Sequence, residues 1–142
     1  MKISTKGRYG LKAVVDIAGH TNDEERCVSL KAVAGRQGIS ENYLEQIVAP
    51  LKKARVLHSV RGAGGGYYLA KSAESLTVGE VLRVLEGSLA PADCVLDDVA
   101  ACADSDCASC STKTVWESLF DSINQVVDSI TIADLMKNIE MI

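Results

Sequence analysis

Residues 28–54 read VSLKAVAGRQGISENYLEQIVAPLKKA, and this stretch decides the fold. Ser29 can cap a short helix with an apolar inner face, and Gly38 then tolerates the positive φ of a tight interhelical turn. Ile39 lies in that turn, placed to fill the space between two helices, and Ser40 can cap the second helix. Helix, glycine turn and helix at this length predict a helix-turn-helix unit.

The second helix of this unit has one apolar face. Apolar side chains recur at Tyr43, Ile47, Val48 and Leu51, and we expect them to point into the core. Pro50 removes one backbone donor, so a kink or an early end of the helix is expected there.

A β-hairpin is expected directly after the helix pair. Residues 57–60 (LHSV) and 67–70 (YYLA) favour strands, and a glycine-rich link joins them. A hairpin at this position is a wing. A phosphate-binding loop is excluded because neither GxGxxG nor GxxxxGKS/T is present, and a strand, not a helix, follows the glycines.

Further helices are expected on both sides of this winged unit. Residues 4–20 place apolar side chains at helical spacing, and residues 77–87 carry a T-x-x-E capping box before a terminal glycine. Residues 112–130 form a longer helix, and a short helix opening with T-x-x-D follows. The predicted fold class is mainly α: a winged helix-turn-helix DNA-binding domain with a long C-terminal dimerisation helix.

Three regions follow from this reading. Residues 1–87 form the winged helix-turn-helix region, residues 88–111 a cysteine-rich loop, and residues 112–142 the dimerisation helix and the short final helix. Apolar residues of the long helix alternate in steps of three and four: Trp116, Leu119, Ile123, Val126 and Ile130. This narrow seam is typical of a helix that pairs with a partner helix, and an amphipathic helix packed on its own domain fits it equally.

Charge is divided unevenly along the 142 residues, whose net charge is −4. Residues 1–72 hold twelve Lys and Arg against six Asp and Glu, whereas residues 73–142 hold three against thirteen. The basic half favours contact with a polyanion, and a solvated basic face is the alternative. No run of about 18 apolar residues and no secretory pattern occurs, so we expect a cytoplasmic protein, where stable disulfides are rare.

Polar residues of the second helix have the chemistry to read bases. Asn42 and Gln46 carry carboxamides that can bond adenine, and Glu45 can accept from cytosine or repel phosphate. Alone, these are ordinary solvated helix residues. Arg61 favours the DNA interpretation, because it leads a glycine-rich wing that can approach the backbone and enter a narrow minor groove. Three residues at the start of the first helix suit phosphate contact: Lys6, Arg8 and Tyr9.

Four of the five cysteines lie in residues 94–110, CVLDDVAACADSDCASC, at spacings C-x7-C-x4-C-x2-C. An iron–sulfur cluster takes four thiolates, and irregular loops hold it well. Zinc also accepts four thiolates, but it usually shows two C-x2-C pairs and only one is present. A thiol switch without metal stays open. We expect the fifth cysteine, Cys27, to be buried as a small hydrophobe.

Three pieces of the sequence, STKGRYG, YLEQ and SVRGAGGGY, resemble in order and spacing the IscR/CymR family of bacterial winged helix-turn-helix transcription regulators. The resemblance covers nearly the whole chain. It implies a homodimer clasped by the long C-terminal helices, a palindromic operator DNA, and site choice tuned by Glu45. The full candidate set of DNA contacts is Lys6, Arg8, Tyr9, Ser40, Asn42, Tyr43, Glu45, Gln46, Arg61, Gly62, Ala63 and Gly64.

The resemblance also bears on the cysteines. One branch, resembling IscR, binds a 2Fe-2S cluster in this loop, and the other, resembling CymR, lacks these cysteines and works with cysteine synthase. The first branch commonly uses three cysteines and a histidine, but Lys113 stands where that histidine would be. We therefore predict an all-cysteine ligand set: Cys94, Cys102, Cys107 and Cys110.

The expected function is a dimeric transcription regulator whose operator binding depends on the cluster, with iron–sulfur assembly proteins or cysteine synthase as further partners. The alternative is a cluster-free regulator of cysteine or sulfur metabolism that acts by thiol redox or through a partner enzyme. A pure interaction module is another rival. A thiol oxidoreductase is disfavoured because no histidine lies near the cysteines, so an enzyme is not expected. The acids around the cysteines predict a low reduction potential.

Overall fold

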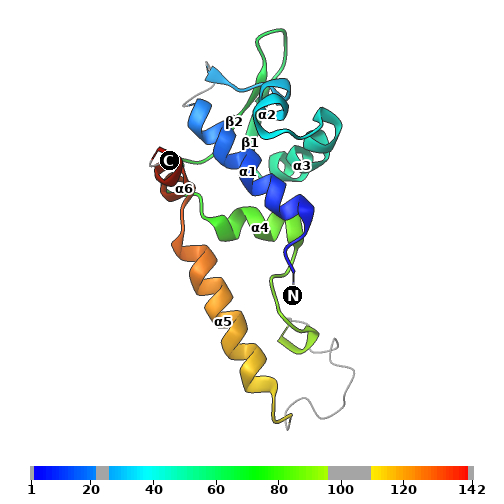
Figure 1. Ribbon diagram of the computed structural model, residues 1–142, viewed down its shortest axis with the longest axis vertical. Coiled ribbons are helices and arrows are strands. Elements are labelled where there is room, and N and C mark those ends of the chain that lie inside the picture. Colours follow the sequence, from blue (N-terminus) through cyan, green and yellow to red (C-terminus); the bar gives the residue numbers. More distant parts are fainter. Residues whose placement is uncertain (1, 22–25, 96–109, 141–142) are drawn as a thin grey trace.

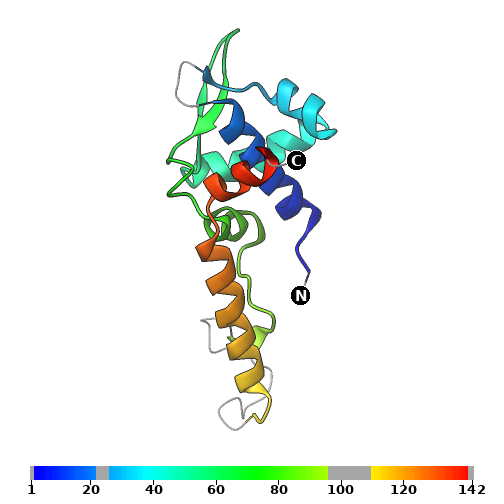
Figure 2. The ribbon, with the colours of Figure 1, turned by 60° about the vertical axis from the view of Figure 1, so that its left-hand side comes forward.

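The computed structural model describes residues 2–21, 26–95 and 110–140. Its elements are α1 (Thr5–His20), α2 (Leu30–Gln37), α3 (Glu41–Lys53), β1 (Leu57–Val60), β2 (Gly66–Leu69), α4 (Val78–Glu86), the short 3-10 helix η2 (Asp93–Val95), α5 (Lys113–Ser129) and α6 (Ile132–Glu140). Helices α1 to α4, the hairpin and α6 form a head, from which α5 extends as a long arm (Figure 1, Figure 2). The predicted mainly helical winged helix-turn-helix with a long C-terminal helix is confirmed.

The turn between α2 and α3 is built as the sequence predicted. Ser29 and Ser40 each accept a hydrogen bond from the backbone N–H of the third residue of the helix that follows, at 3.1 and 3.2 Å. Gly38 has φ 65° and ψ 35°, the left-handed conformation that ends a helix at little cost only for glycine. Ile39 is buried in the turn and fills the space between the two helices.

The core of the head lies between α1, α3, α4 and the hairpin. Four residues of α3 are buried in it: Leu44, Ile47, Val48 and Leu51. Tyr43 packs only at the edge of this core and is half-buried. Ile132 at the start of α6 is fully buried in the same core, so the short final helix folds back onto the head. Burying side chains of this size contributes about 1.5–3 kcal/mol each.

Pro50 does not end α3, so the early end expected there is wrong. The helix continues to Lys53, and the Ala54 N–H bonds back to the Pro50 carbonyl at 3.0 Å. Because Pro50 lies in the last full turn and the next residue, Leu51, is fully buried, core packing holds the turn despite the missing donor. The chain then leaves the helix through Arg55, which has φ 62°.

The predicted hairpin is confirmed, with the second strand beginning at Gly66 instead of at residue 67. Its base is held by a bridge to the segment before α2. The N–H and carbonyl of Val28 exchange hydrogen bonds with Tyr67, both at 2.8 Å. A Cβ on Gly66 would lie 2.3 Å from the Val28 carbonyl oxygen, so this close backbone approach requires glycine.

Helix α5 packs one face on α4. A small second cluster joins Val78, Leu82 and Leu89 to Phe120, Ile123 and Val127 of α5 and to Ile130, the residue that follows α5. Ile123 and Ile130 of the predicted seam therefore face the chain's own α4. By contrast, Val126 is 56% exposed and Trp116 is 36% exposed. The seam thus divides between packing on its own domain and a free face.

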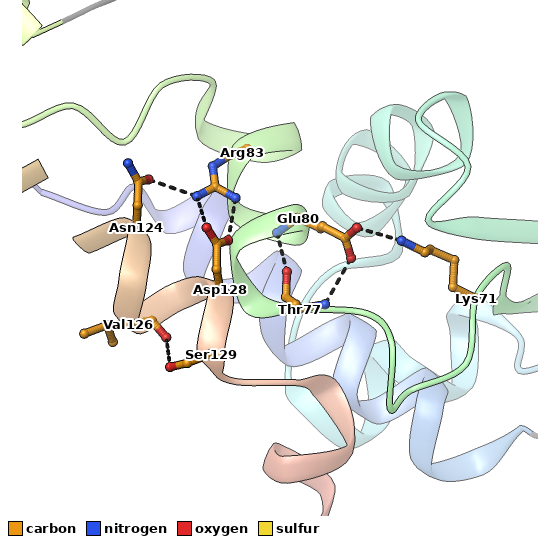
Figure 3. A network of polar contacts seen from close by, with 8 residues as sticks. All are labelled: Lys71, Thr77, Glu80, Arg83, Asn124, Val126, Asp128 and Ser129. Atoms are coloured by element: carbon orange, nitrogen blue, oxygen red, sulfur yellow. Dashed lines mark hydrogen bonds and ion pairs between the residues drawn. The ribbon is translucent and has the colours of Figure 1, made fainter. Parts of the chain in front are cut away.

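A polar clasp reinforces the same contact (Figure 3). Arg83 of α4 donates two hydrogen bonds to the Asp128 carboxylate at 2.7 and 2.9 Å, and a third to the Asn124 side-chain oxygen at 2.9 Å. At the start of α4, Thr77 and Glu80 form the predicted capping box. The capping box at the start of α4 and the glycine at its end, Gly87, are the two signals that the sequence predicted.

Within the described ranges, no helix combines the length and the apolar character that a bilayer crossing needs.

Candidate nucleic-acid interface

The first turns of α3 present polar side chains to solvent. The exposed residues there are Ser40, Glu41, Asn42, Glu45 and Gln46. The opposite side of the helix is the buried face already described. Because Asn42 and Gln46 are four residues apart on a helix, their carboxamides share one side and are available to the edges of bases.

The start of α1 lies against the start of α3 through two tyrosines. The rings of Tyr9 and Tyr43 meet edge to face, with centroids 6.2 Å apart and an interplanar angle of 90°. The Lys12 Nζ lies 5.6 Å from the Tyr9 ring centroid. Both rings are half-buried, so each packs against its neighbour and keeps one edge in solvent. Lys6 and Arg8 belong to the same first turns of α1 as Tyr9, so this ring contact holds the segment that carries them beside α3.

A carboxylate from α4 holds the N-terminus of α1. Glu86 accepts from the Ser4 N–H at 3.2 and 3.3 Å, and it also accepts a short hydrogen bond from the Ser4 hydroxyl. Ser4 in turn caps α1 by accepting from the Gly7 N–H at 3.1 Å. A negative charge at this end also complements the helix dipole. The last residue of α4 is therefore tied to the helix that carries Lys6 and Arg8.

The wing tip is exposed from Arg61 to Gly64, which includes four of the predicted contacts. Gly62 has φ 111°, a conformation that side chains rarely adopt, and its carbonyl accepts from the Gly65 N–H at 3.0 Å. Ala63 and Gly64 are the two central residues of this tight turn.

Cys27 is not fully buried, so the expectation of simple burial is wrong. Its thiol is half-buried and donates to the Gly64 carbonyl at 3.1 Å. The reason is the bridge formed by Val28, which sets the preceding residue beside the wing instead of inside the core. No sequence pattern predicts this contact, because the two residues are 37 positions apart.

The basic candidates are electrostatically available. Across the part of the chain that the structure describes, no salt bridge within 4.0 Å engages Lys6, Arg8 or Arg61. Cations without a local carboxylate are those that gain most from a phosphate backbone.

One buried ion pair fixes α2 against α1, and the sequence analysis missed it. The Asp16 carboxylate, only 2% exposed, accepts from Arg36 at 2.6, 3.0 and 3.2 Å and from the Gln37 amide at 2.8 Å. Burial alone would raise the pKa of Asp16, but these hydrogen bonds and the charge of Arg36 outweigh it and hold the pKa below its ordinary value. An aspartate between Val15 and Ile17 on an apolar helix face was the available signal.

Two of the four predicted cluster ligands are described. Cys94 is half-buried in η2, which packs against α5, and Cys110 is exposed, with its Sγ 3.4 Å from the Thr112 hydroxyl. Cys102 and Cys107 lie outside the described residues. Among the residues that are described, no group of three His, Cys, Asp or Glu side chains could hold a metal ion.

The donor set suits an iron–sulfur cluster chemically. Cys94 and Cys110 both supply a cysteine sulfur, the donor that such clusters use. The Nζ of Lys113 lies 3.9 Å from the Glu117 carboxylate, along α5, so this residue forms an ion pair within its own helix.

The family that matches this chain and the two relatives described next are all named as transcriptional regulators. Residues 3–138 match the Rrf2 family, described as "Iron-dependent Transcriptional regulator". The chain is similar to the HTH-type transcriptional regulator CymR of Bacillus subtilis, with 39% identity over 135 residues that cover 95% of this chain and 89% of that protein. It is also similar to the HTH-type transcriptional regulator IscR of Escherichia coli, with 37% identity covering 100% of this chain and 84% of that protein.

Solved structures give the same two names. The structure of CymR, "the Global Cysteine Regulator" of B. subtilis, matches with a TM-score of 0.79 and 38% identity, covering 97% of this chain and 98% of that one. The structure of IscR from T. potens matches with a TM-score of 0.75 and 47% identity, covering 97% and 88%. These relatives are named as transcriptional regulators and not as enzymes.

Proposed function

Because this chain belongs to the Rrf2 family of transcriptional regulators, we propose that it binds operator DNA as a homodimer and that a 2Fe-2S cluster in its cysteine segment sets the DNA affinity. The observation that carries this proposal is the exposed polar face of α3 together with an exposed wing arginine, Arg61, which no described carboxylate pairs within 4.0 Å. Both features face solvent on a helix-turn-helix scaffold that the core and the Asp16–Arg36 pair hold rigid.

The proposed DNA contacts are assigned to the exposed groups of α3, the wing and the start of α1. The N-terminal turns of α3 enter the major groove, where Asn42 and Gln46 bond base edges and Glu45 rejects sites that bring phosphate close. Arg61 at the wing reaches the minor groove. Lys6 and Arg8 meet phosphates. Tyr9 and Tyr43 keep α1 and α3 in register between these groups.

A partner helix is supported by the free face of α5. Val115, Leu119, Ser122 and Val126 follow one another in steps of four, three and four, the spacing of a two-helix seam. Val115 is 55% exposed and Val126 is 56% exposed, so the chain alone leaves this stripe in water. A two-fold dimer through α5 presents two copies of α3, which suits a palindromic operator with half-sites about 34 Å apart.

The cysteine segment is the proposed ligand source, with Cys94, Cys102, Cys107 and Cys110 as the holding residues. When bound, the cluster supplies one-electron redox chemistry and negative charge. The segment joins α4 to α5, and the described thiols flank it, one in η2 and one just before α5. Glu86, the last residue of α4, holds the start of α1, so strain in the segment has a covalent and hydrogen-bonded route to the DNA-contacting head.

Operator binding is tested first with duplexes selected from a random pool by the full-length protein. Arg61→Ala should weaken binding to all sequences and lower the salt slope by about one. Gln46→Ala should instead relax the preference at one base pair by about 1–3 kcal/mol. Lys137→Ala on α6 removes an exposed cation that is not among the proposed contacts, and it is the matched control. Wild-type affinity and preference in both interface variants would contradict the DNA-binding surface.

Cluster binding is tested by anaerobic purification followed by iron and acid-labile sulfide analysis and visible absorption. We expect two irons and two sulfides per chain, lost in Cys94→Ser and Cys110→Ser and kept in the control Cys27→Ser. Operator affinity is then compared between cluster-loaded and apo protein. Equal affinity would remove the coupling, even if the cluster is present.

The similarity to CymR favours a second candidate function. In it the protein binds no cluster and regulates cysteine or sulfur metabolism through thiol redox or through a partner enzyme such as cysteine synthase. Iron-free protein from the anaerobic preparation, together with operator binding that changes on thiol oxidation, is the result expected for this alternative.

A further inference from the structure

A groove of about 770 Å³ lies between α1, α2 and α6, and among the described residues that line it only Arg8 belongs to the proposed DNA contacts. Its size falls in the range typical of small-molecule sites, about 300–1,000 Å³. Its floor is apolar and comes from α1 and α6: Leu11, Val15, Leu135 and Met136. Methionine and leucine side chains on two separate helices form a surface that adapts to an apolar guest.

The rim of the groove is cationic. Arg8, Lys12 and Arg36 line it, together with His20. Asp16 is the one carboxylate that lines it within the described chain, and its oxygens are already occupied by Arg36 and Gln37. Arg8 and Lys12 have no carboxylate within 4.0 Å among these residues. One negative charge therefore faces three permanent positive charges around an apolar floor.

We propose that this groove binds an amphipathic organic anion: a single carboxylate head on an apolar body about the size of a medium-chain acyl group. The head pairs with Lys12 and with the guanidinium of Arg36. Arg36 bonds Asp16 through Nε and Nη2, and no acceptor among the described residues engages its Nη1. The body covers Leu11, Leu135 and Met136. A cationic or uncharged guest of the same shape lacks the head's partners.

The position gives such a ligand a route to regulation, and this consequence rests on the proposed function. Arg36 and Gln37 end α2 and immediately precede Gly38, the turn residue before α3. A ligand that contacts Arg36 acts on the same ion pair that fixes α2 against α1.

The test uses the full-length protein and sodium decanoate, with decylamine as a probe of the same length and opposite charge. Calorimetric titration should show decanoate binding and decylamine binding at least about tenfold more weakly, because its charge is repelled by the rim. Amide shifts of ¹⁵N-labelled protein should concentrate in α1, α2 and α6. Equal affinity for the two probes, no decanoate binding at millimolar concentration, or shifts confined to α5 would overturn the site.

Variants locate the binding within the groove. Lys12→Glu reverses one rim charge and should weaken decanoate binding about five- to tenfold, whereas Lys31→Glu makes the same change on α2 outside the groove and should leave it unchanged. Met136→Gln keeps every charge and should weaken decanoate by losing apolar contact. Circular dichroism and gel filtration verify that each variant keeps the fold and the oligomeric state.

Two results separate this site from other outcomes. If a second copy of the chain covers the groove, decanoate binds only after dimer dissociation and the site is overturned for the native assembly. If the protein fails to bind any operator, the proposed function fails, while the decanoate titration still decides the groove on its own result.

Discussion

At the scale of single residues, Asp16 is a buried carboxylate that accepts hydrogen bonds from both Arg36 and Gln37. Asp16→Asn keeps the shape but removes the charge that Arg36 and Gln37 bond. We expect it to lower the free energy of unfolding at pH 7 by about 1–3 kcal/mol, the cost of leaving buried hydrogen-bonding groups poorly paired. Urea unfolding measures it, with Glu74→Gln, an exposed carboxylate outside any described ion pair, as the control.

The same variant has a defined pH dependence. The pKa of Asp16 is lowered in the folded protein from an ordinary value of 3.8, so the folded state favours the carboxylate and its stabilisation is fully present above pH 3.8. The difference between wild type and Asp16→Asn should shrink as the pH falls below that value, because wild-type Asp16 then takes up a proton. A difference that stays constant down to pH 2 would contradict this account.

Gly66 and Gly64 offer a matched pair of residues in the wing. A Cβ on Gly66 would lie 2.3 Å from the Val28 carbonyl oxygen and 2.8 Å from the Ser29 nitrogen, both backbone atoms that cannot move cheaply. Gly66→Ala should therefore cost about 1–3 kcal/mol. A Cβ on Gly64 meets nothing within 4 Å, so Gly64→Ala should stay within about 0.5 kcal/mol of wild type. Thermal unfolding compares them, and equal losses would be the adverse result.

Residues whose role is local were predictable, and those whose role is distant were not. Ser29, Gly38 and Ser40 act on their own turn, so sequence spacing alone indicated each of them. Asp16 meets Arg36 at a separation of 20 residues, and Cys27 meets Gly64 at 37. No periodicity reports such pairs, because they depend on how whole helices and strands are packed.

At the scale of elements, the clasp between α4 and α5 is an ion pair with two parallel hydrogen bonds. Hydrogen bonding from Arg83 lowers the pKa of Asp128, and the bond to Asp128 raises the pKa of Arg83. Because Arg83 is 38% exposed and Asp128 is 48% exposed, solvent screens the pair. A double-mutant cycle of Arg83→Met and Asp128→Asn should give a coupling of about 0.5–1 kcal/mol that falls with salt.

The comparison for that cycle is the pair Lys113–Glu117, which lies within α5 at 3.9 Å. It should couple by about 0.3–0.5 kcal/mol or less, as exposed pairs four residues apart on a helix do. Similar coupling in the two pairs would mean that the clasp adds nothing to the packing of α5 on α4.

Element boundaries also separate what periodicity predicts from what packing decides. The capping box of Thr77 and Glu80 placed the start of α4 correctly, since both groups lie in one turn. Pro50 suggested an earlier end for α3, but the burial of Leu51 overrode it. In α5 the pattern revealed an apolar seam and could not say which residues meet α4, because that depends on how the helix is rotated against the head.

At the scale of the whole molecule, the free stripe of α5 predicts self-association. Val126→Asp places a charge on that stripe in each copy and should weaken the dimer at least about tenfold, through lost apolar burial and repulsion across the two-fold axis. Gln125→Asp adds the same charge one residue along, at the edge of the stripe, and should have a smaller effect. Sedimentation equilibrium measures both, and unchanged association in Val126→Asp would place the dimer contact elsewhere.

For the molecule as a whole, the uneven division of charge and the glycine-rich wing were sufficient to predict a polyanion-binding head. Its candidates Asn42, Gln46 and Arg61 are exposed, and their contact with DNA stays a prediction. The groove between α1, α2 and α6 could not be predicted from the sequence, because its walls include residues more than 120 positions apart. Cys102 and Cys107 remain predictions, since they lie outside the described residues.

The two faces of α3 have one further consequence. The side chains that hold the helix in place, Leu44, Ile47, Val48 and Leu51, share no position with the exposed Asn42, Glu45 and Gln46. Substitution on an exposed face of this kind usually changes stability by no more than about 0.5 kcal/mol. Duplicated genes can therefore drift toward new target sequences through a handful of codons while the scaffold stays intact, and a laboratory library restricted to those codons should yield folded proteins of altered preference.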